Sequence, residues 1–195
     1  PLKEIVSLKK EYGALLFLDE AHGVGILGDT GQGLAEEFNL QGQIDFQMGT
    51  LGKALGSAGG YLATSQAWHD LLINKARSLI YSTAPPPSQV AASLAALTLL
   101  GSPEGQKLRE RLQENISAFE SRIPNLKSHP PIIPRVLGEN SAALAASASL
   151  LKEGFLVPAI RYPTVPRGTA RLRITLSAAH SPENIHHLKE ALASL

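Results

Sequence analysis

The feature that most limits the folds open to this 195-residue chain is a continuous apolar run that ends in two acids. Residues 14–18 read Ala-Leu-Leu-Phe-Leu, and Asp19 and Glu20 follow at once. An unbroken apolar run of this length is typical of a strand buried on both faces of a parallel sheet. Open α/β sheets bind ligands beyond the carboxyl ends of their strands. The run therefore predicts an α/β fold with functional residues at the carboxyl end of this strand, beginning with Asp19.

The remaining pattern predicts two domains of different character. Helical spacing over residues 2–9 ends at Gly13, and a Ser-Pro-Glu capping signal at 102–104 opens a long, charged helix. Further strands are expected at 44–48, 60–64, 132–136, 155–160 and 171–176, with helices at 65–79, 87–100, 140–153 and after Ser181. We expect an α/β domain over residues 1–102 and a small α+β domain over 103–195, which begins with the long linking helix.

Composition excludes several classes of function. The chain has 18 Lys and Arg against 17 Asp and Glu, and this balance argues against broad binding to nucleic acid or to an anionic membrane. The absence of cysteine removes disulfides, thiolate metal sites and cysteine nucleophiles, and we expect no metal centre. No apolar run is long enough to span a bilayer and no signal peptide is evident, so the expected location is the cytoplasm.

Residues 19–22, Asp-Glu-Ala-His, also spell the hydrolysis motif of one class of helicases, in which the acids hold Mg²⁺. That chemistry requires an upstream phosphate loop of the form GxxxxGK[ST]. The one Gly-Lys pair in this chain, Gly52-Lys53, is followed by Ala54. The motif is therefore incomplete, and a nucleotide-dependent enzyme remains only an alternative.

Residues 23–28, Gly-Val-Gly-Ile-Leu-Gly, match the pattern GxGxxG. A dinucleotide fingerprint opens a helix at once and is followed about 20 residues later by an acid that ends the next strand. Here the next residues read as a loop, and Asp45 lies at the start of its apolar run rather than at the end. The simpler interpretation is a glycine-rich loop that lets the backbone pass close to another group.

Lys53 is the sharpest chemical signal in the sequence. It is the only Lys, Arg, Asp or Glu between Asp45 and Asp70, and its neighbours are Gly, Ala, Leu and Ser. Such surroundings indicate a desolvated amine, and desolvation favours the neutral form that Schiff-base chemistry needs. The ordinary alternative is a surface lysine on a loop. Thr50, three residues earlier, offers a hydroxyl for a phosphate oxygen.

Asp19, Thr50 and Lys53 together predict a site for pyridoxal phosphate (PLP). This cofactor needs a lysine for its aldehyde, a carboxylate that keeps its ring nitrogen protonated, and hydroxyl or backbone donors for its phosphate. An acid at a strand end, a lysine on a glycine-rich turn and a nearby threonine meet these needs.

Longer segments carry a resemblance to a known family. The segments are LFLDEAHGVGILG (16–28), GTLGKALG (49–56), IYST (80–83) and AIRYPTVPRGTARLR (159–173). In this order they resemble the α-oxoamine synthases, fold-type I PLP enzymes that condense an amino acid with an acyl thioester and release CO₂. The resemblance implies that residues 1–102 are the C-terminal part of a large PLP-binding domain and that 103–195 are its small C-terminal domain.

The resemblance also implies roles for residues near the predicted cofactor. Lys53 would bind the cofactor aldehyde covalently and then act as the base at the substrate Cα. Asp19 would pair with the ring nitrogen, His22 with the phenolic oxygen and Thr50 with the phosphate. Taken alone, His22 is an ordinary loop histidine, and only the motif gives it this role.

Other implied roles belong to the partner subunit and to the substrate. Ser82 and Thr83 resemble a segment that reaches the phosphate of the partner subunit's cofactor, which implies a homodimer. Arg173 would hold the carboxylate of the amino acid, with Thr164 in the same substrate-facing segment. Arg171 lies on the same face as Arg173 by strand alternation, so periodicity alone leaves both open; the resemblance selects Arg173.

Residues 159–166 and 175–180 resemble most the branch of the family that joins L-alanine to a pimeloyl thioester, of CoA or of acyl carrier protein, in biotin synthesis. Glycine C-acetyltransferase and 5-aminolevulinate synthase share the same Lys, Asp, His and Arg and remain alternatives. In the family an N-terminal half precedes this segment and supplies a ring that stacks on the cofactor and much of the acyl pocket. We therefore expect the isolated chain to be inactive and to expose strand edges and apolar faces. A fragment that binds nothing by itself is the remaining alternative.

Overall fold

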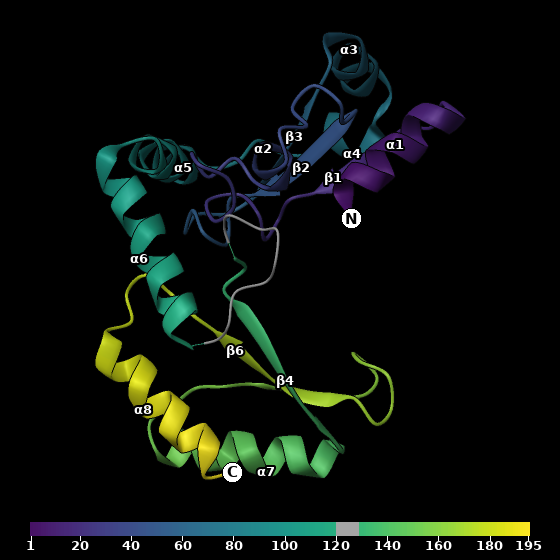
Figure 1. Cartoon of the computed structure of the whole chain (residues 1–195). Helices are drawn as coiled ribbons and strands as arrows, with labels where there is room; N and C mark the ends of the chain where they lie inside the picture. The colour runs from purple at the N-terminus through teal and green to yellow at the C-terminus, as the bar shows by residue number, and fades with distance from the viewer. Residues whose placement is uncertain (120–128) are drawn as a thin grey trace. The chain divides into compact units, whose positions relative to one another are not determined.

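The computed structural model describes residues 1–119 and 129–195, which form two compact units (Figure 1). Unit 1 covers residues 1–109, and unit 2 covers 110–119 and 129–195. The division falls inside helix α6 (Pro103–Phe119), the helix that the sequence predicts as the link between domains. Within the described residues, no helix is both long enough and apolar enough to cross a membrane.

Unit 1 contains a three-stranded sheet of order β1-β2-β3, in which β1 and β2 run parallel and β3 is antiparallel to β2. Its elements are α1 (Leu2–Tyr12), β1 (Phe17–Asp19), α2 (Leu34–Glu37), β2 (Phe46–Thr50), β3 (Gly60–Thr64), α3 (Gln66–Lys75), α4 (Arg77–Ile80), α5 (Pro87–Leu100) and the start of α6. Leu2 and Val6 of α1 form a small core with Leu40, against which Leu16 and Leu18 pack. As predicted, Gly13 caps the C-terminus of α1, and its φ of 61° lies in the left-handed region that favours glycine.

The prediction that the strand over residues 14–18 is buried on both faces is wrong for this chain. The strand is short, and the side chains of Leu15 and Phe17 are 59% and 57% exposed. Among the described residues β1 pairs only with β2, so it is an edge strand. The stacked rings of Phe17 and Phe46, with centroids 6.0 Å apart, cover part of one face. The ring of Trp68 of α3 also contacts Phe46, with 5.1 Å between the two ring centroids.

Asp45 joins α1 to the sheet. Its Oδ2 accepts hydrogen bonds from Lys9 Nζ and from the backbone N–H of Leu16, both at 2.7 Å. These bonds, the Lys9 bond first, lower the pKa of Asp45 below its ordinary value. Asp45, the acid considered above for a dinucleotide site, thus holds the N-terminal helix in place.

We expect Asp45→Asn to destabilise unit 1 at neutral pH. A carboxyl whose pKa is lower in the folded state stabilises that state above its unfolded pKa, and the contribution is lost as pH falls through the folded value. The difference in thermal unfolding between the variant and the parent should therefore be constant at neutral pH and shrink below about pH 4. Glu11→Gln, at an exposed position of the same helix, is the control. A difference that persists unchanged to pH 2 would contradict the assignment.

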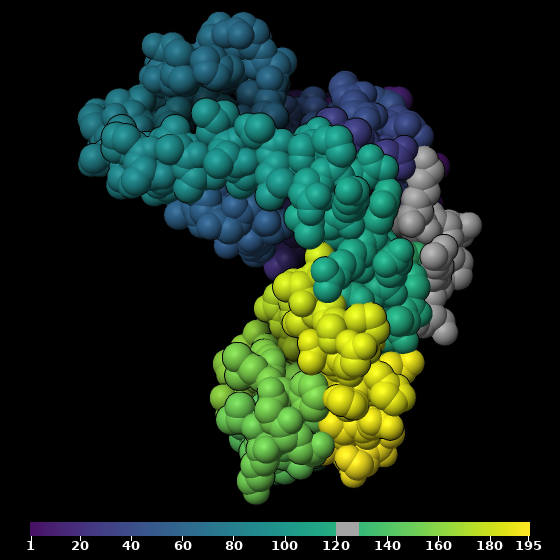
Figure 2. Space-filling view, turned by 90° about the vertical axis from the view of Figure 1, so that its left-hand side faces the viewer, coloured from purple at the N-terminus to yellow at the C-terminus, as the bar shows by residue number. Residues whose placement is uncertain are grey.

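Unit 2 is a three-stranded antiparallel sheet of order β4-β6-β5 with helices on one face (Figure 1). Its further elements are β4 (Ile132–Gly138), α7 (Asn140–Lys152), β5 (Ala159–Ile160), β6 (Ala170–Thr175) and α8 (Pro182–Ala193). Leu150 of α7 and Leu172 and Ile174 of β6 are its largest fully buried side chains, and α8 lies beside α7 (Figure 2). Strand β5 is shorter than the predicted 155–160, because Pro158 has no N–H for the sheet.

Candidate active site

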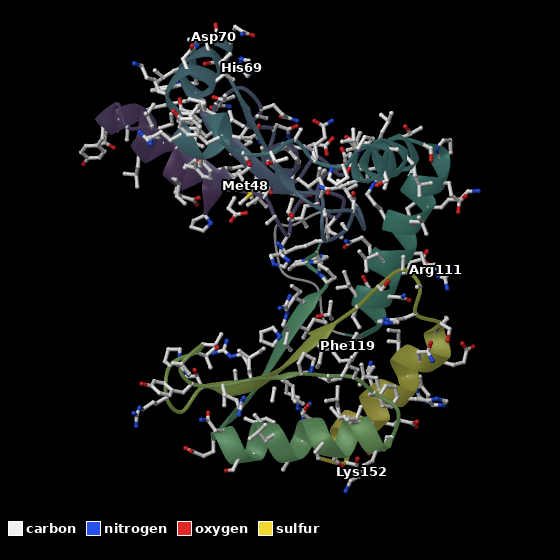
Figure 3. The ribbon with its side chains drawn as sticks, turned by 180° about the vertical axis from the view of Figure 1, so that it is seen from behind. Met48, His69, Asp70, Arg111, Phe119 and Lys152 are labelled. Atoms are coloured by element: carbon white, nitrogen blue, oxygen red, sulfur yellow. The ribbon has the colours of Figure 1, made fainter. Side chains whose placement is uncertain are left out.

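The carboxyl ends of β1 and β2 lie at one edge of the unit 1 sheet. Asp19, the last residue of β1, is in register with Met48 of β2, which is labelled in Figure 3. Thr50 ends β2, and Lys53 follows in the next turn. Because neighbouring parallel strands end at the same edge, the structure brings these predicted residues to one place.

The carboxylate of Asp19 has one oxygen in use. Its Oδ1 accepts the backbone N–H of Ala21 at 2.8 Å, which turns the chain toward His22. Within the described part of the chain, no hydrogen bond to Oδ2 is present. Asp19 and His22 are both exposed. The second carboxylate oxygen can therefore accept a proton-bearing group such as a protonated ring nitrogen.

Lys53 lies in a closed turn between β2 and β3. The turn is held by the N–H of Leu51 on the carbonyl of Gly59 at 2.9 Å and by the N–H of Gly56 on the carbonyl of Lys53 at 3.0 Å. The side chain of Lys53 is exposed. The expectation of a desolvated amine is therefore wrong for this chain as described, because a turn of small residues supplies no bulk to cover it.

Thr50 is more constrained than the sequence suggests. Its hydroxyl donates to the carbonyl of Gly59 at 3.1 Å and accepts the N–H of Gly52 at 3.3 Å. The hydroxyl proton is thus committed to the turn itself. A contact between Thr50 and a phosphate stays a prediction, and it requires the bond to Gly59 to be given up.

Helix α5 holds the far side of this turn through groups that the sequence analysis missed. Gln89 Nε2 donates to the carbonyl of Ala58 at 2.7 Å, and the hydroxyls of Ser57 and Ser93 lie 2.8 Å apart. Ser93 is the one buried residue of this helix. Gln89 and Ser93 lie one helical turn apart in an alanine- and leucine-rich segment, and this spacing of polar residues could have indicated a polar contact on one face of the helix.

The glycine-rich loop after β1 is built around carboxylates. Glu20 Oε1 accepts the N–H of Ala35 at 3.0 Å, and Glu37 Oε2 accepts that of Gly28 at 3.1 Å. The Glu36 carboxylate accepts the hydroxyl of Thr30 at 2.7 Å. Glu20, the second acid of the Asp-Glu-Ala-His motif, is buried with its carboxylate bonded to Ala35, which does not support the Mg²⁺ site of the helicase alternative.

The GxGxxG segment opens no helix. Residues 21–31 form successive turns and bends, and α2 begins only at Leu34 and lasts one turn. With Asp45 also committed to Lys9 and Leu16, the geometry does not support dinucleotide binding. The loop matches the simpler interpretation, in which glycines let the backbone approach neighbouring groups.

Ser82 and Thr83 lie beyond the end of α4 and are exposed. In the described residues, no hydrogen bond links either of them to Asp19, Thr50 or Lys53. Their role toward a partner subunit's cofactor therefore stays a prediction.

Arg173, Arg171 and Thr164 lie in unit 2. Arg173 and Arg171 are half-buried on the central strand β6, on the sheet face opposite the helices, where their register partners are Pro134 and Val136 of β4. Arg171 donates its Nε–H to the carbonyl of Thr169 at 3.0 Å.

Thr164 is exposed in the turn that joins β5 to β6. Within residues 1–119 and 129–195, no hydrogen bond or ion pair engages the guanidinium of Arg173. The local bond of Arg171 therefore favours Arg173 as the free bidentate group.

The residues at the β1–β2 edge fit PLP by the chemistry of their donor set. A carboxylate with an open oxygen, an exposed amine and the imidazole of His22 stand on adjacent segments at one sheet edge. Residues 1–119 and 129–195 contain no group of three or more His, Asp or Glu arranged to hold a metal ion.

Comparisons with known proteins agree with this reading. A profile of the aminotransferase class I and II family matches residues 1–192. The chain is 48% identical to 8-amino-7-oxononanoate synthase of Geobacter sulfurreducens over 200 aligned positions, which cover 100% of the chain and 51% of that protein. The corresponding protein of Geobacter metallireducens is 46% identical with the same coverage. The chain thus spans about half the length of the curated relatives it matches.

Solved structures give the same picture. Serine palmitoyltransferase of S. paucimobilis with a bound PLP–myriocin aldimine superposes with a TM-score of 0.89 at 30% identity, over 100% of this chain and 50% of that one. The 8-amino-7-oxononanoate synthase of Francisella tularensis superposes with a TM-score of 0.80 at 29% identity, over 97% of this chain and 57% of that one.

Proposed function

The chain belongs to the aminotransferase class I and II family, and we propose that it is the lysine-bearing half of a PLP-dependent synthase that joins L-alanine to a pimeloyl thioester with loss of CO₂. The product would be 8-amino-7-oxononanoate, a precursor of biotin. The observation that carries the proposal is the shared sheet edge, at which Asp19 ends β1 and the turn with Lys53 follows the parallel strand β2.

The fold and the cofactor class are confirmed by relatives. The chain has the fold of fold-type I PLP transferases. A solved serine palmitoyltransferase that holds PLP as an internal aldimine superposes on it with a TM-score of 0.86. The curated relatives at 42–48% identity are named 8-amino-7-oxononanoate synthase. Their names support the proposed substrates, L-alanine and a pimeloyl thioester, over those of glycine C-acetyltransferase and 5-aminolevulinate synthase.

When bound, PLP supplies an aldehyde that takes up amines and a ring that accepts the electrons released at the substrate Cα. Lys53 Nζ would hold the cofactor aldehyde and would act as the base for the Cα proton of the substrate. Asp19 would keep the ring nitrogen protonated through Oδ2, and His22 would hydrogen-bond the phenolic oxygen. The guanidinium of Arg173 holds the carboxylate of the amino acid through paired hydrogen bonds.

The proposed enzyme has further partners. The acyl donor is the thioester of CoA or of acyl carrier protein, and the active unit is a homodimer in which Ser82 and Thr83 reach the partner subunit's cofactor. We place the reaction in the cytoplasm. The isolated chain is expected to be inactive, because the curated relatives are about twice as long and the resemblance puts the acyl pocket largely outside this segment.

The test is complementation of a biotin-requiring bacterium that lacks its own 8-amino-7-oxononanoate synthase. The chain would be fused behind the part of the Geobacter sulfurreducens relative that it does not match. Growth without biotin is expected from the fusion and not from the chain alone, and the purified fusion should release CO₂ only with L-alanine and pimeloyl thioester. A folded, PLP-loaded fusion that turns over glycine or serine but not alanine would contradict the proposed substrates.

A further inference from the structure

Glu20 is a buried acid at the junction between β1 and the glycine-rich loop, and its side chain is only 4% exposed. Its backbone N–H donates to the carbonyl of Met48 at 2.7 Å, which extends the β1–β2 pairing one residue past Asp19. Its carbonyl accepts the N–H groups of Gly23 and Val24 at 2.8 and 3.0 Å. The main chain of Glu20 therefore fixes Asp19 on one side and the turn that carries His22 on the other.

The carboxylate of Glu20 holds the other end of the loop. Its Oε1 accepts the N–H of Ala35 at 3.0 Å, 15 positions along the chain. A side chain at either Gly23 or Gly33 would collide with this carboxylate, and Gly33 has a φ of 101° that side chains rarely adopt. The loop between these two glycines thus closes around one buried carboxylate.

The charge of Glu20 also affects Tyr61 of β3. The ring of Tyr61 lies over Gly49 of β2, where a side chain would collide with it. Burial, and then the charge of Glu20, raises the pKa of Tyr61. The carboxylate is therefore close enough to the end of β2 to affect a side chain beside the turn that carries Lys53.

We propose that Glu20 is a positioning residue, whose buried carboxylate fixes the glycine-rich loop so that Asp19 and His22 are held in place at the end of β1. A buried carboxylate loses hydration, and it is retained at low cost only where N–H groups replace the water. Its hydrogen bond from the Ala35 N–H is directional, so it sets the orientation of the loop more tightly than apolar packing does. The consequence for PLP binding rests on the proposed function; the effect on the loop does not.

The first experiment measures amide hydrogen exchange in the purified protein without cofactor. Glu20→Gln removes the charge and keeps the shape, and we expect the exchange of Ala21, Gly23 and Val24 to rise roughly tenfold. The matched control is Glu37→Gln, which changes another buried carboxylate bonded to the same loop and should affect Gly28 instead. Unchanged exchange at Ala21, Gly23 and Val24 in Glu20→Gln would overturn the inference.

The second experiment places the same two substitutions in the fusion with the N-terminal half and compares PLP affinity with stability. Both variants should lower the unfolding temperature, but only Glu20→Gln should weaken PLP binding, by roughly tenfold. Equal losses of PLP affinity in both variants would show that Glu20 acts only through stability and would overturn the positioning role. Glu20→Ala leaves the Ala35 N–H unsatisfied. If that variant does not fold, the comparison of Glu20→Gln with Glu37→Gln still tests the positioning role.

The two proposals fail in different ways. If the parent fusion with the N-terminal half forms no borohydride-stable adduct with PLP at Lys53, the proposed function fails whatever the exchange data show. If the parent forms the adduct and Glu20→Gln binds PLP as tightly as the parent, the positioning inference fails and the proposed function stands.

Discussion

Replacing Lys53 by alanine is expected to abolish the borohydride-stable attachment of PLP and the visible absorbance that accompanies it. The expected loss of turnover in the fused enzyme is roughly a thousandfold or more, because one amine would hold the cofactor and also move the Cα proton. No other Lys, Arg, Asp or Glu lies between Asp45 and Asp70, so no neighbouring charged group along this segment replaces it.

The measurement is reduction with borohydride followed by peptide mass spectrometry, with absorbance spectra taken before reduction. Lys75→Ala, which removes an exposed lysine at the end of α3, is the control and should leave both signals unchanged. Lys53→Arg keeps a positive charge and should fail like alanine, because a guanidinium does not form the bond to the aldehyde. Attachment of the label at another lysine in the parent would contradict the assignment.

Local signals in the sequence predict many element boundaries correctly. Ser102 caps α6 by accepting the N–H of Gly105 at 3.2 Å, and Ser181 and Asn184 form a reciprocal capping box on α8. These bonds join residues three apart, so the sequence contains everything that determines them. The ends of β1 and β2, which carry Asp19 and the turn with Lys53, share one sheet edge because the two strands run parallel, as the apolar run before Asp19 predicts.

Properties that depend on distant partners escape the sequence. The apolar run before Asp19 predicts burial on two faces, but burial depends on which strands and helices cover it, and here Phe17 stays exposed. The commitment of the Thr50 hydroxyl to Gly59 and of the Glu20 carboxylate to Ala35 arises only when a loop closes. Acids beside a run of glycines are a signal for such closure, because glycine N–H groups can approach a carboxylate closely.

Arg173→Ala is expected to weaken the binding of L-alanine to the PLP-loaded enzyme by roughly a hundredfold. A hydrogen bond to a charged group contributes about 1.5–3 kcal/mol, and a bidentate guanidinium–carboxylate pair makes two. Arg171→Ala is the matched control on the same strand and face. Because the Nε–H of Arg171 donates to Thr169, we expect its loss to change alanine binding by less than about threefold.

Ethylamine, which is alanine without its carboxylate, separates carboxylate binding from a general loss of structure. The change in cofactor absorbance on adding each amine gives its affinity for the parent and for both variants. If Arg173 holds the carboxylate, Arg173→Ala weakens alanine binding and leaves ethylamine binding as it was, while Arg173→Lys restores part of the difference through its charge but not the paired geometry. Equal losses for both amines would assign Arg173 to the stability of the β6 sheet, and a selective loss in Arg171→Ala would transfer the role to its neighbour.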